Sequence, residues 1–225
     1  MKTTLLTPET DGNAVKTAAE LIRAGEVVGM PTETVYGLAA NALNGEAVKN
    51  IFLAKGRPQD NPLIVHIADF EQIYDLCPAV PPQAKQLAEA FWPGPLTMIV
   101  PKGGCIPDEV SCGLDTVGIR LPSHPMARAL IRESGVPLAA PSANTSGRPS
   151  TTTAAHVMHD MDGKIAAVLD GGACGVGVES TVITLALERP RLLRPGGITL
   201  EQLRSVLGEV DVDRALYEKI GDDVK

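Results

Sequence analysis

The sequence is poor in aromatic residues and has no excess of positive charge. Its 225 residues include 3 Phe, 3 Tyr and 1 Trp, so aromatics make up only 3% of the chain. Proteins that hold single-stranded nucleic acid stack its bases on aromatic rings, and this composition disfavours such a surface. Twenty basic against 27 acidic side chains give a formal net charge of −7. That balance argues against nonspecific coating of nucleic acid, which needs an excess of Lys and Arg.

The sequence also lacks the usual signs of a disulfide framework, a zinc site or a membrane span. Its four cysteines, Cys77, Cys105, Cys112 and Cys174, form no C-x-x-C pair and have no histidine at metal-finger spacing. The N-terminus shows no signal peptide, so we interpret them as reduced thiols in a cytosolic protein. Apolar runs stay well below the roughly 18–20 residues of a membrane helix. We therefore expect a soluble, cytoplasmic protein with no membrane partner.

Glycine and proline, by contrast, are abundant, with 22 and 18 residues. The hydrophobic fraction of 44% is ordinary for a globular protein and too high for a disordered one. The length suits one large domain or two small ones. Composition alone leaves the excess of glycine and proline open, since it is typical of disorder and also of sharp turns around a loop-built site.

Helix and strand patterns alternate along the chain. Apolar side chains recur with helical spacing in five segments, which are 11–24, 45–55, 82–91, 124–134 and 199–207. Short apolar runs predict eight strands, at 27–30, 63–67, 96–100, 117–121, 136–140, 166–169, 180–187 and 191–193. We expect parallel pairing among the early strands and antiparallel pairing among the close-set late ones. The prediction is one α/β domain over residues 1–208, with a twisted mixed sheet flanked by helices, and a charged tail or the start of a linker at 209–225.

Polar clusters follow several predicted strands, where open α/β sheets bind ligands. Lys55 and Arg57 lie two residues apart on a loop shaped by two prolines, so both can reach one anion. His66 lies within an apolar strand, which is more typical of a satisfied core residue. Alternation places Arg120 on the polar face of its strand, where it needs an anionic partner. Spacing does not decide between a structural carboxylate and a substrate carboxylate.

Further candidates lie in a hydroxyl-rich loop at 140–150 and a glycine-rich segment at 171–181, although each could be an ordinary turn. Neither the pattern G-x-x-x-x-G-K-[ST] nor G-x-G-x-x-G occurs. We find no Ser-His-Asp or Cys-His arrangement and no ligand set for a protein-built metal site. The sequence therefore indicates a concave, phosphate-binding cavity without identifying the reaction. Its candidate cations and hydroxyls are Lys55, Arg57, Arg120, Arg194, Thr34, Ser142 and Ser180.

Five motifs, in this order, resemble those of the YrdC-like family over about residues 10–207. They are MPTETVYGL at 30–38, the K-x-R loop from Lys55 to NPL at 61–63, PSANTSG at 141–147, ESTV at 179–182, and RPG at 194–196. The resemblance implies an L-threonylcarbamoyladenylate synthase, which combines L-threonine, bicarbonate or CO2, and ATP for the t6A modification of tRNA. It implies Mg²⁺ held mainly by the ATP phosphates. It also implies that the tRNA-modifying machinery downstream receives the product.

The resemblance also assigns roles to individual residues. L-Threonine would contact Thr34, His66, Arg120 and Ser180, with Arg120 holding the carboxylate, which reverses the core interpretation of His66. ATP would contact Arg57, Asn61, Thr116, Ser142, Asn144, Ser150 and Arg194. Lys55 and Arg57 would be catalytic, and we expect Lys55 and Asn144 near the phosphates.

Other interpretations stay open at this stage. Some relatives carry an additional C-terminal domain after a linker, whereas this chain ends at Lys225, so we expect a short form or a truncated two-domain protein. YrdC-like domains are also linked to double-stranded RNA, and weak RNA binding is an alternative that the net charge of −7 opposes. A paralogue acting on another carbamoyl-type substrate is a third, which the complete set of threonine-side residues opposes.

Overall fold

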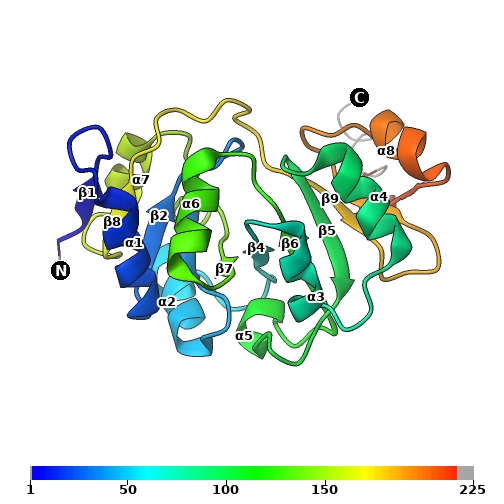
Figure 1. The fold of residues 1–225 in the computed structure, drawn as a ribbon, viewed down its shortest axis with the longest axis horizontal. Helices are drawn as coiled ribbons and strands as arrows, with labels where there is room; N and C mark the ends of the chain where they lie inside the picture. Colours follow the sequence, from blue (N-terminus) through cyan, green and yellow to red (C-terminus); the bar gives the residue numbers. More distant parts are fainter. Residues whose placement is uncertain (1, 217–225) are drawn as a thin grey trace.

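The computed structural model describes residues 2–216 (Figure 1), in which a long mixed sheet is flanked by helices. Eleven strands of this part of the chain follow the order β1-β8-β2-β3-β7-β4-β6-β5-β9-β10-β11. The strands are β1 (Thr4–Leu6), β2 (Val28–Met30), β3 (Gly37–Asn41), β4 (Ile64–His66), β5 (Leu96–Pro101), β6 (Thr116–Arg120), β7 (Leu138–Ala139), β8 (Ala167–Leu169), β9 (Thr181–Thr184), β10 (Arg191–Arg194) and β11 (Asp211–Val212).

The helices cover the sheet and connect its strands. They are α1 (Ala14–Arg23), α2 (Gly45–Lys55), the 3-10 turn η1 (Phe70–Gln72), α3 (Ile73–Leu76), α4 (Pro82–Phe91), α5 (Asp108–Ser111), α6 (Pro125–Ser134), α7 (Ala154–Met161) and α8 (Leu200–Leu207). The five predicted helices are confirmed within three residues at each end. No helix among residues 2–216 has both the length and the apolar character needed to cross a membrane.

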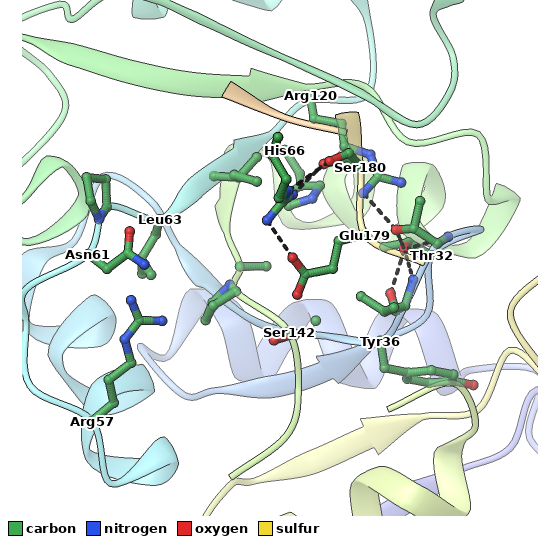
Figure 2. A pocket seen from close by; sticks show the side chains of 18 residues that line it. Thr32, Tyr36, Arg57, Asn61, Leu63, His66, Arg120, Ser142, Glu179 and Ser180 are labelled. Atoms are coloured by element: carbon green, nitrogen blue, oxygen red, sulfur yellow. Dashed lines mark hydrogen bonds and ion pairs between the residues drawn. The ribbon is translucent and has the colours of Figure 1, made fainter. Parts of the chain in front are cut away.

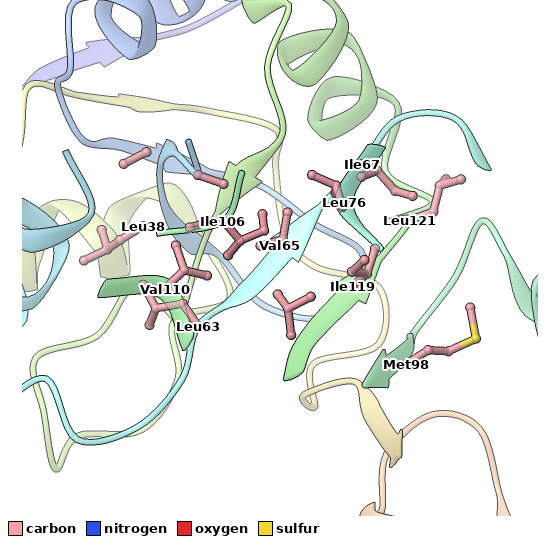
Figure 3. Close-up of a cluster of buried hydrophobic side chains, with 14 of the residues drawn as sticks. Leu38, Leu63, Val65, Ile67, Leu76, Met98, Ile106, Val110, Ile119 and Leu121 are labelled. Atoms are coloured by element: carbon pink, nitrogen blue, oxygen red, sulfur yellow. The ribbon is translucent and has the colours of Figure 1, made fainter. Parts of the chain in front are cut away.

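Side chains alternate between two apolar clusters on opposite faces of the sheet. On β3, Leu38 belongs to the larger cluster and Ala39 to the smaller one. The larger cluster continues through Val65 and Ile119 on the neighbouring strands β4 and β6 (Figure 3). The smaller cluster lies under α1 and α6, which pack against each other. Because the central strands are buried on both faces, their short runs read as continuously apolar.

Strand register brings polar side chains together at one edge of the sheet. Strands β4 and β6 are parallel, and His66 lies opposite Arg120 at their carboxyl ends. Strand β5 runs antiparallel on the other side of β6, which places Thr97 opposite Arg120. The predicted mixed pairing is confirmed, including the antiparallel late pair β9 and β10. The early pair β2 and β3 is antiparallel, however, because only six residues connect them, too few for a parallel crossover.

The expected C-terminal tail needs a correction over its described part. Val210 is buried, and β11 pairs in parallel with β10 through Asp211 and Arg191. The apolar pattern V-x-V at 210–212 is short and is flanked by charged residues, so the composition of this segment predicted a tail. Residues 217–225 lie outside the described part of the chain.

Candidate active site

A cavity of about 200 Å³ opens at the carboxyl ends of β4 and β6 (Figure 2). Eight of the twelve residues predicted from the sequence line it, namely Thr34, Arg57, Asn61, His66, Arg120, Ser142, Ser180 and Arg194. Arg57 and Asn61 lie at one end, and Arg120, Ser180 and Thr32 lie at the other. The structure thus separates two groups of side chains within one cavity.

The turn between β2 and β3 builds one wall of the cavity. Thr32 is buried, and its Oγ1 accepts hydrogen bonds from the backbone N–H groups of Thr34 and Val35 at 3.2 and 3.3 Å. The hydroxyls of Thr32 and Thr34 lie 2.9 Å apart. Local side-chain to backbone bonds of this kind fix a turn. The turn therefore holds the Thr34 hydroxyl in place for Arg120.

Arg120 is only 3% exposed and has a structural anionic partner. Its Nη2 donates to Glu33 Oε1, its Nη1 donates to Thr34 Oγ1 at 2.9 Å, and its Nε donates to the Gly94 carbonyl at 3.4 Å. Glu33 Oε2 accepts the backbone N–H of Ser123 at 3.1 Å. A guanidinium has five N–H donors, so two on the Nη atoms have no partner among the described residues. The residue pattern did not decide which anion would pair with Arg120. Its partner, Glu33, lies in the MPTETVYGL motif beside Thr34 and was not among the predicted site residues.

His66 is a buried imidazole with an unused nitrogen. It is 4% exposed, and its Nδ1 has no hydrogen-bond partner within residues 2–216. Burial, and secondarily the nearby Arg120 charge, lowers the pKa of His66 to about 3. The ring is therefore neutral at physiological pH. Its position on the cavity wall and its unsatisfied nitrogen do not fit the interpretation as a satisfied core residue.

The depressed pKa of His66 predicts a pH-dependent stability. When pH falls, the unfolded protein takes up this proton near pH 6.5, whereas the folded protein does so only near pH 3. We therefore expect this residue to lower the free energy of unfolding by about 2 kcal/mol between pH 7 and pH 5. Urea unfolding of the wild type and of His66→Gln measures the difference. His156→Gln, at an exposed position on α7, is the matched control, and an equal pH slope in all three proteins would contradict the prediction.

The opposite wall is held by a network around Glu179. Arg194 Nη1 pairs with Glu179 Oε2, and Arg194 Nη2 donates to Ser180 Oγ at 3.1 Å. Ser180 Oγ also lies 2.8 Å from Thr97 Oγ1. Ser150 does not line the cavity, but its hydroxyl donates to Glu179 Oε1 at 3.1 Å. Glu179 was not among the predicted site residues, although it opens the ESTV motif.

Gly196 explains the last motif, because it lets the chain pass close behind Ser180. A Cβ at this position would overlap backbone atoms of Glu179 and Thr181. Overpacking of this kind typically costs 1–3 kcal/mol. We expect Gly196→Ala to lower the melting temperature by about 6 °C, corresponding to about 2 kcal/mol. Gly104→Ala is the control, since its Cβ would meet nothing within 4 Å, and equal melting temperatures would contradict the prediction.

Arg57 contributes the least neutralised charge at the cavity. Its described ion-pair partner is Asp60, at 3.8 Å, whose side chain is 67% exposed, whereas the Arg57 side chain is 20% exposed. Arg120 and Arg194 are each paired with a carboxylate at much shorter range. Interaction with an exposed carboxylate is screened by water. The positive potential of the cavity therefore comes mainly from Arg57.

Besides Ser150, three predicted residues do not line the cavity. Thr116 begins β6, and four residues of strand, about 13 Å, separate it from Arg120 at the other end. Asn144 is buried, and its Nδ2 donates to the carbonyls of Thr145 and Arg148 at 3.0 and 2.7 Å. Lys55 is 3% exposed, and its Nζ donates to the carbonyls of Ser142 and Asn144. The Lys55 and Asn144 side chains both hold backbone behind the cavity wall, and the expectation that they lie near the phosphates stays a prediction.

Residues 2–216 contain no group of three or more His, Cys, Asp or Glu side chains placed to hold a metal ion. The carboxylates of Glu33 and Glu179 are each engaged by an arginine.

Comparison with known proteins places this site in a family. The Sua5/YciO/YrdC family model, described as "Telomere recombination", matches residues 20–196. Threonylcarbamoyl-AMP synthase of Bacillus subtilis is 58% identical over 214 residues, covering 93% of this chain and 61% of that protein. The crystal structure of P. abyssi Sua5 complexed with L-threonine matches this fold with a TM-score of 0.92 at 51% identity, covering 96% of this chain and 64% of that one.

A shorter relative aligns over nearly its whole length. The putative threonylcarbamoyl-AMP synthase of Mycobacterium tuberculosis is 37% identical over 201 residues, covering 89% of this chain and 92% of that protein. By contrast, the chain spans about three fifths of the Bacillus protein and of the Pyrococcus abyssi threonylcarbamoyl-AMP synthase. The family model covers most of the present chain and all five sequence motifs. The chain therefore belongs to the Sua5/YciO/YrdC family.

Proposed function

We propose that this chain forms L-threonylcarbamoyl-AMP and pyrophosphate from L-threonine, bicarbonate or CO2, and ATP. The observation that carries the proposal is the single cavity with its two groups of side chains, in a fold with a TM-score of 0.92 to a structure solved with L-threonine. The product would pass to the enzymes that complete the t6A modification of tRNA, in the cytoplasm.

The end of the cavity around Arg120 suits an amino acid. The two unused N–H donors of Arg120 can bind a carboxylate by a forked contact. Neutral His66 and the hydroxyls of Thr34 and Ser180 add hydrogen-bonding groups that carry no charge. With CO2, the threonine amine attacks the carbon and loses a proton, giving a carbamate. With bicarbonate, the amine displaces hydroxide from the carbon, and that hydroxide leaves as water after taking the amine proton.

The end around Arg57 and Asn61 suits the nucleotide. The carbamate oxygen attacks the α-phosphorus of ATP, the bond from that phosphorus to the β-phosphate oxygen breaks, and pyrophosphate leaves. Arg57 and, from the Ser180 side of the cavity, Arg194 offset the negative charge on the phosphates, and Ser142 and Asn61 orient them. Such a displacement needs no nucleophilic side chain. Mg²⁺ would enter with the nucleotide, take its ligands mainly from the phosphates and water, and neutralise part of their charge.

The other two interpretations have less support. An RNA-binding module needs a broad basic surface, whereas two of the three arginines lining the cavity are closely paired with carboxylates and the third lies 3.8 Å from Asp60. A different carbamoyl-type substrate would need other groups at the amino-acid end. Substrates that differ by one methyl group are nevertheless separated by only about 1–3 kcal/mol in an apolar pocket, so the assay must compare amino acids directly.

Pyrophosphate release tests the proposed function. The protein is incubated with ATP, Mg²⁺ and bicarbonate, with L-threonine, with L-serine, or without amino acid. We expect release that depends on threonine and bicarbonate and that is about 10- to 200-fold slower with serine. The same reaction should yield an adenylate with the mass of threonylcarbamoyl-AMP. Release at the same rate without any amino acid would contradict the proposal.

A further inference from the structure

The Lys55 side chain lies behind the cavity wall, at the point where two motifs meet. Its ammonium group donates to the Ser142 carbonyl and, at 2.8 Å, to the Asn144 carbonyl. In return, its own carbonyl accepts the backbone N–H of Ser146 at 3.2 Å. Lys55 is therefore bonded to the 142–146 loop through both its side chain and its backbone.

The 142–146 loop also has other ties, beginning with an isolated antiparallel β-bridge between Ser142 and Gly37. Ala143 N–H donates to the Tyr36 carbonyl at 2.8 Å, and Thr145 N–H donates to Asp160 Oδ2 at 2.9 Å. The carbonyls of Ser142 and Asn144 both turn away from the cavity toward Lys55, while Ser142 itself lines it. Without the ammonium, the Ser142 and Asn144 carbonyls behind the cavity wall would each lose a charge-assisted hydrogen bond.

The same residue is connected to Arg57 on the other side of the cavity. Lys55 is the last residue of α2, and Gly56 ends the helix in the left-handed conformation, with φ of 62°. Arg57 follows directly, with its backbone N–H bonded to the Phe52 carbonyl at 3.1 Å. In Figure 2, Arg57 and Ser142 approach the cavity from different segments. One side chain thus links the segment that carries Arg57 to the segment that carries Ser142.

We propose that Lys55 is a positioning residue, whose ammonium ties the 142–146 loop to the end of α2 and so fixes Ser142 relative to Arg57. That Arg57 and Ser142 contact ATP rests on the proposed function. The hydrogen bonds from Lys55 to the 142–146 loop do not depend on it. The K-x-R and S-x-N motifs then act as one unit, in which Arg57 and Ser142 face the cavity and Lys55 and Asn144 hold the backbone behind it.

The charge of Lys55 makes the tie sensitive to pH. Burial, and then the Arg57 charge, lowers the pKa of Lys55 to about 8, while Glu179 before β9 and Asp160 on α7 oppose this shift. The charged ammonium has three donors and makes stronger hydrogen bonds to carbonyls than the neutral amine does. Above about pH 8 the tie should therefore weaken in the protein without nucleotide.

Hydrogen exchange and steady-state kinetics test the proposal together. The variants are Lys55→Met, which removes the donors, Lys55→Arg, which keeps a permanent charge, and Lys49→Met as the control. Lys49 lies on the same helix but is partly exposed and pairs with Glu46 and Glu109. Exchange of the amides of residues 143–148 is measured at pH 7 without nucleotide. The kcat/KM for ATP is then measured from pH 6.5 to 9.5.

We expect Lys55→Met to speed exchange in 143–148 and to lower kcat/KM for ATP about 100-fold, the typical cost of misplacing a reacting group. Lys55→Arg should recover part of that loss. The wild-type kcat/KM should fall above about pH 8 with a break that is absent in Lys55→Arg. If Lys55→Met does not fold, the proposal is tested by comparing the pH profile of kcat/KM in the wild type with that in Lys55→Arg.

Three results would overturn the proposal. Exchange in Lys55→Met equal to that in Lys49→Met would show that Lys55 does not hold the loop. Loss of ATP affinity with unchanged exchange would make Lys55 a direct phosphate contact. A wild-type pH break that persists in Lys55→Arg would assign the titration to another group. If the wild type makes no threonine-dependent pyrophosphate, the proposed function fails, while the exchange data still report on the tie.

Discussion

Replacing Arg57 by alanine should reduce formation of threonylcarbamoyl-AMP to about one thousandth of the wild-type rate, with little change in the free energy of unfolding. Removing one group that stabilises charge in a transition state typically costs 100- to 1,000-fold in rate. We expect the upper end of that range here. Arg120 and Arg194 are each neutralised by a buried or half-buried carboxylate, whereas the described ion-pair partner of Arg57 is the exposed Asp60 at 3.8 Å.

The small effect on stability follows from the same contacts. An ion pair with an exposed carboxylate contributes at most about 1 kcal/mol. The backbone N–H of Arg57, which closes the end of α2 on the Phe52 carbonyl, is unaffected by the side-chain substitution. The Arg57→Ala variant should therefore fold, so that a lower reaction rate can be assigned to the lost side chain and not to a loss of stability.

Initial rates of threonine-dependent pyrophosphate release, together with urea unfolding, measure both parts of the Arg57 prediction. Arg57→Lys keeps the charge and loses the planar fork, so its rate should lie between those of alanine and wild type. Arg189→Ala is the matched control, because that arginine pairs with Glu209 on the exposed surface. A rate for Arg57→Ala within threefold of the Arg189→Ala rate would remove Arg57 from the mechanism.

The sequence predicted the fold best where local signals were strong. Helix α2 lies at 45–55 as expected, since Asn44 accepts hydrogen bonds at its start and left-handed Gly56 ends it. Strand β3 was missed because GLAAN is small and almost entirely buried, so it shows no alternation. The antiparallel pairing of β5 with β6 was missed as well. Register between distant strands depends on tertiary packing, which a local pattern does not contain.

In the candidate site, too, local features could be predicted and contacts between distant segments could not. The positions of His66 and Arg120 on neighbouring strands follow from strand ends, which the sequence could mark. The partners of charged groups could not be predicted, because Glu33 and Arg120 are 87 residues apart in the chain. A usable signal did exist for Glu33 and Glu179, since each stands inside a motif beside a predicted ligand-binding residue. For Lys55 the motif indicated importance, and only the structure shows that its ammonium faces backbone carbonyls rather than the cavity.

Replacing Arg120 should raise the KM for threonine about 100-fold, because Arg120 is the buried cation at the end of the cavity that we propose binds the amino acid. Truncating one partner of a buried, hydrogen-bonded charge pair costs about 2–5 kcal/mol, and 100-fold corresponds to about 2.7 kcal/mol. The KM for ATP should change much less, since Arg57 and Asn61 lie at the opposite end of the cavity. This split between the two substrates distinguishes a threonine contact from a general loss of structure.

Glu33 complicates the single substitution and also provides the control. Arg120→Ala leaves a nearly buried carboxylate without its cation, which can destabilise the fold by about 3–5 kcal/mol. The double variant Arg120→Met with Glu33→Gln removes both charges and avoids that penalty, so its KM for threonine is the decisive measurement. Glu33→Gln alone keeps Arg120 and should preserve most of the threonine affinity, because the amide oxygen can still accept from Nη2. A double variant with the wild-type KM for threonine would mean that Arg120 serves only to hold Glu33 and Thr34 in place.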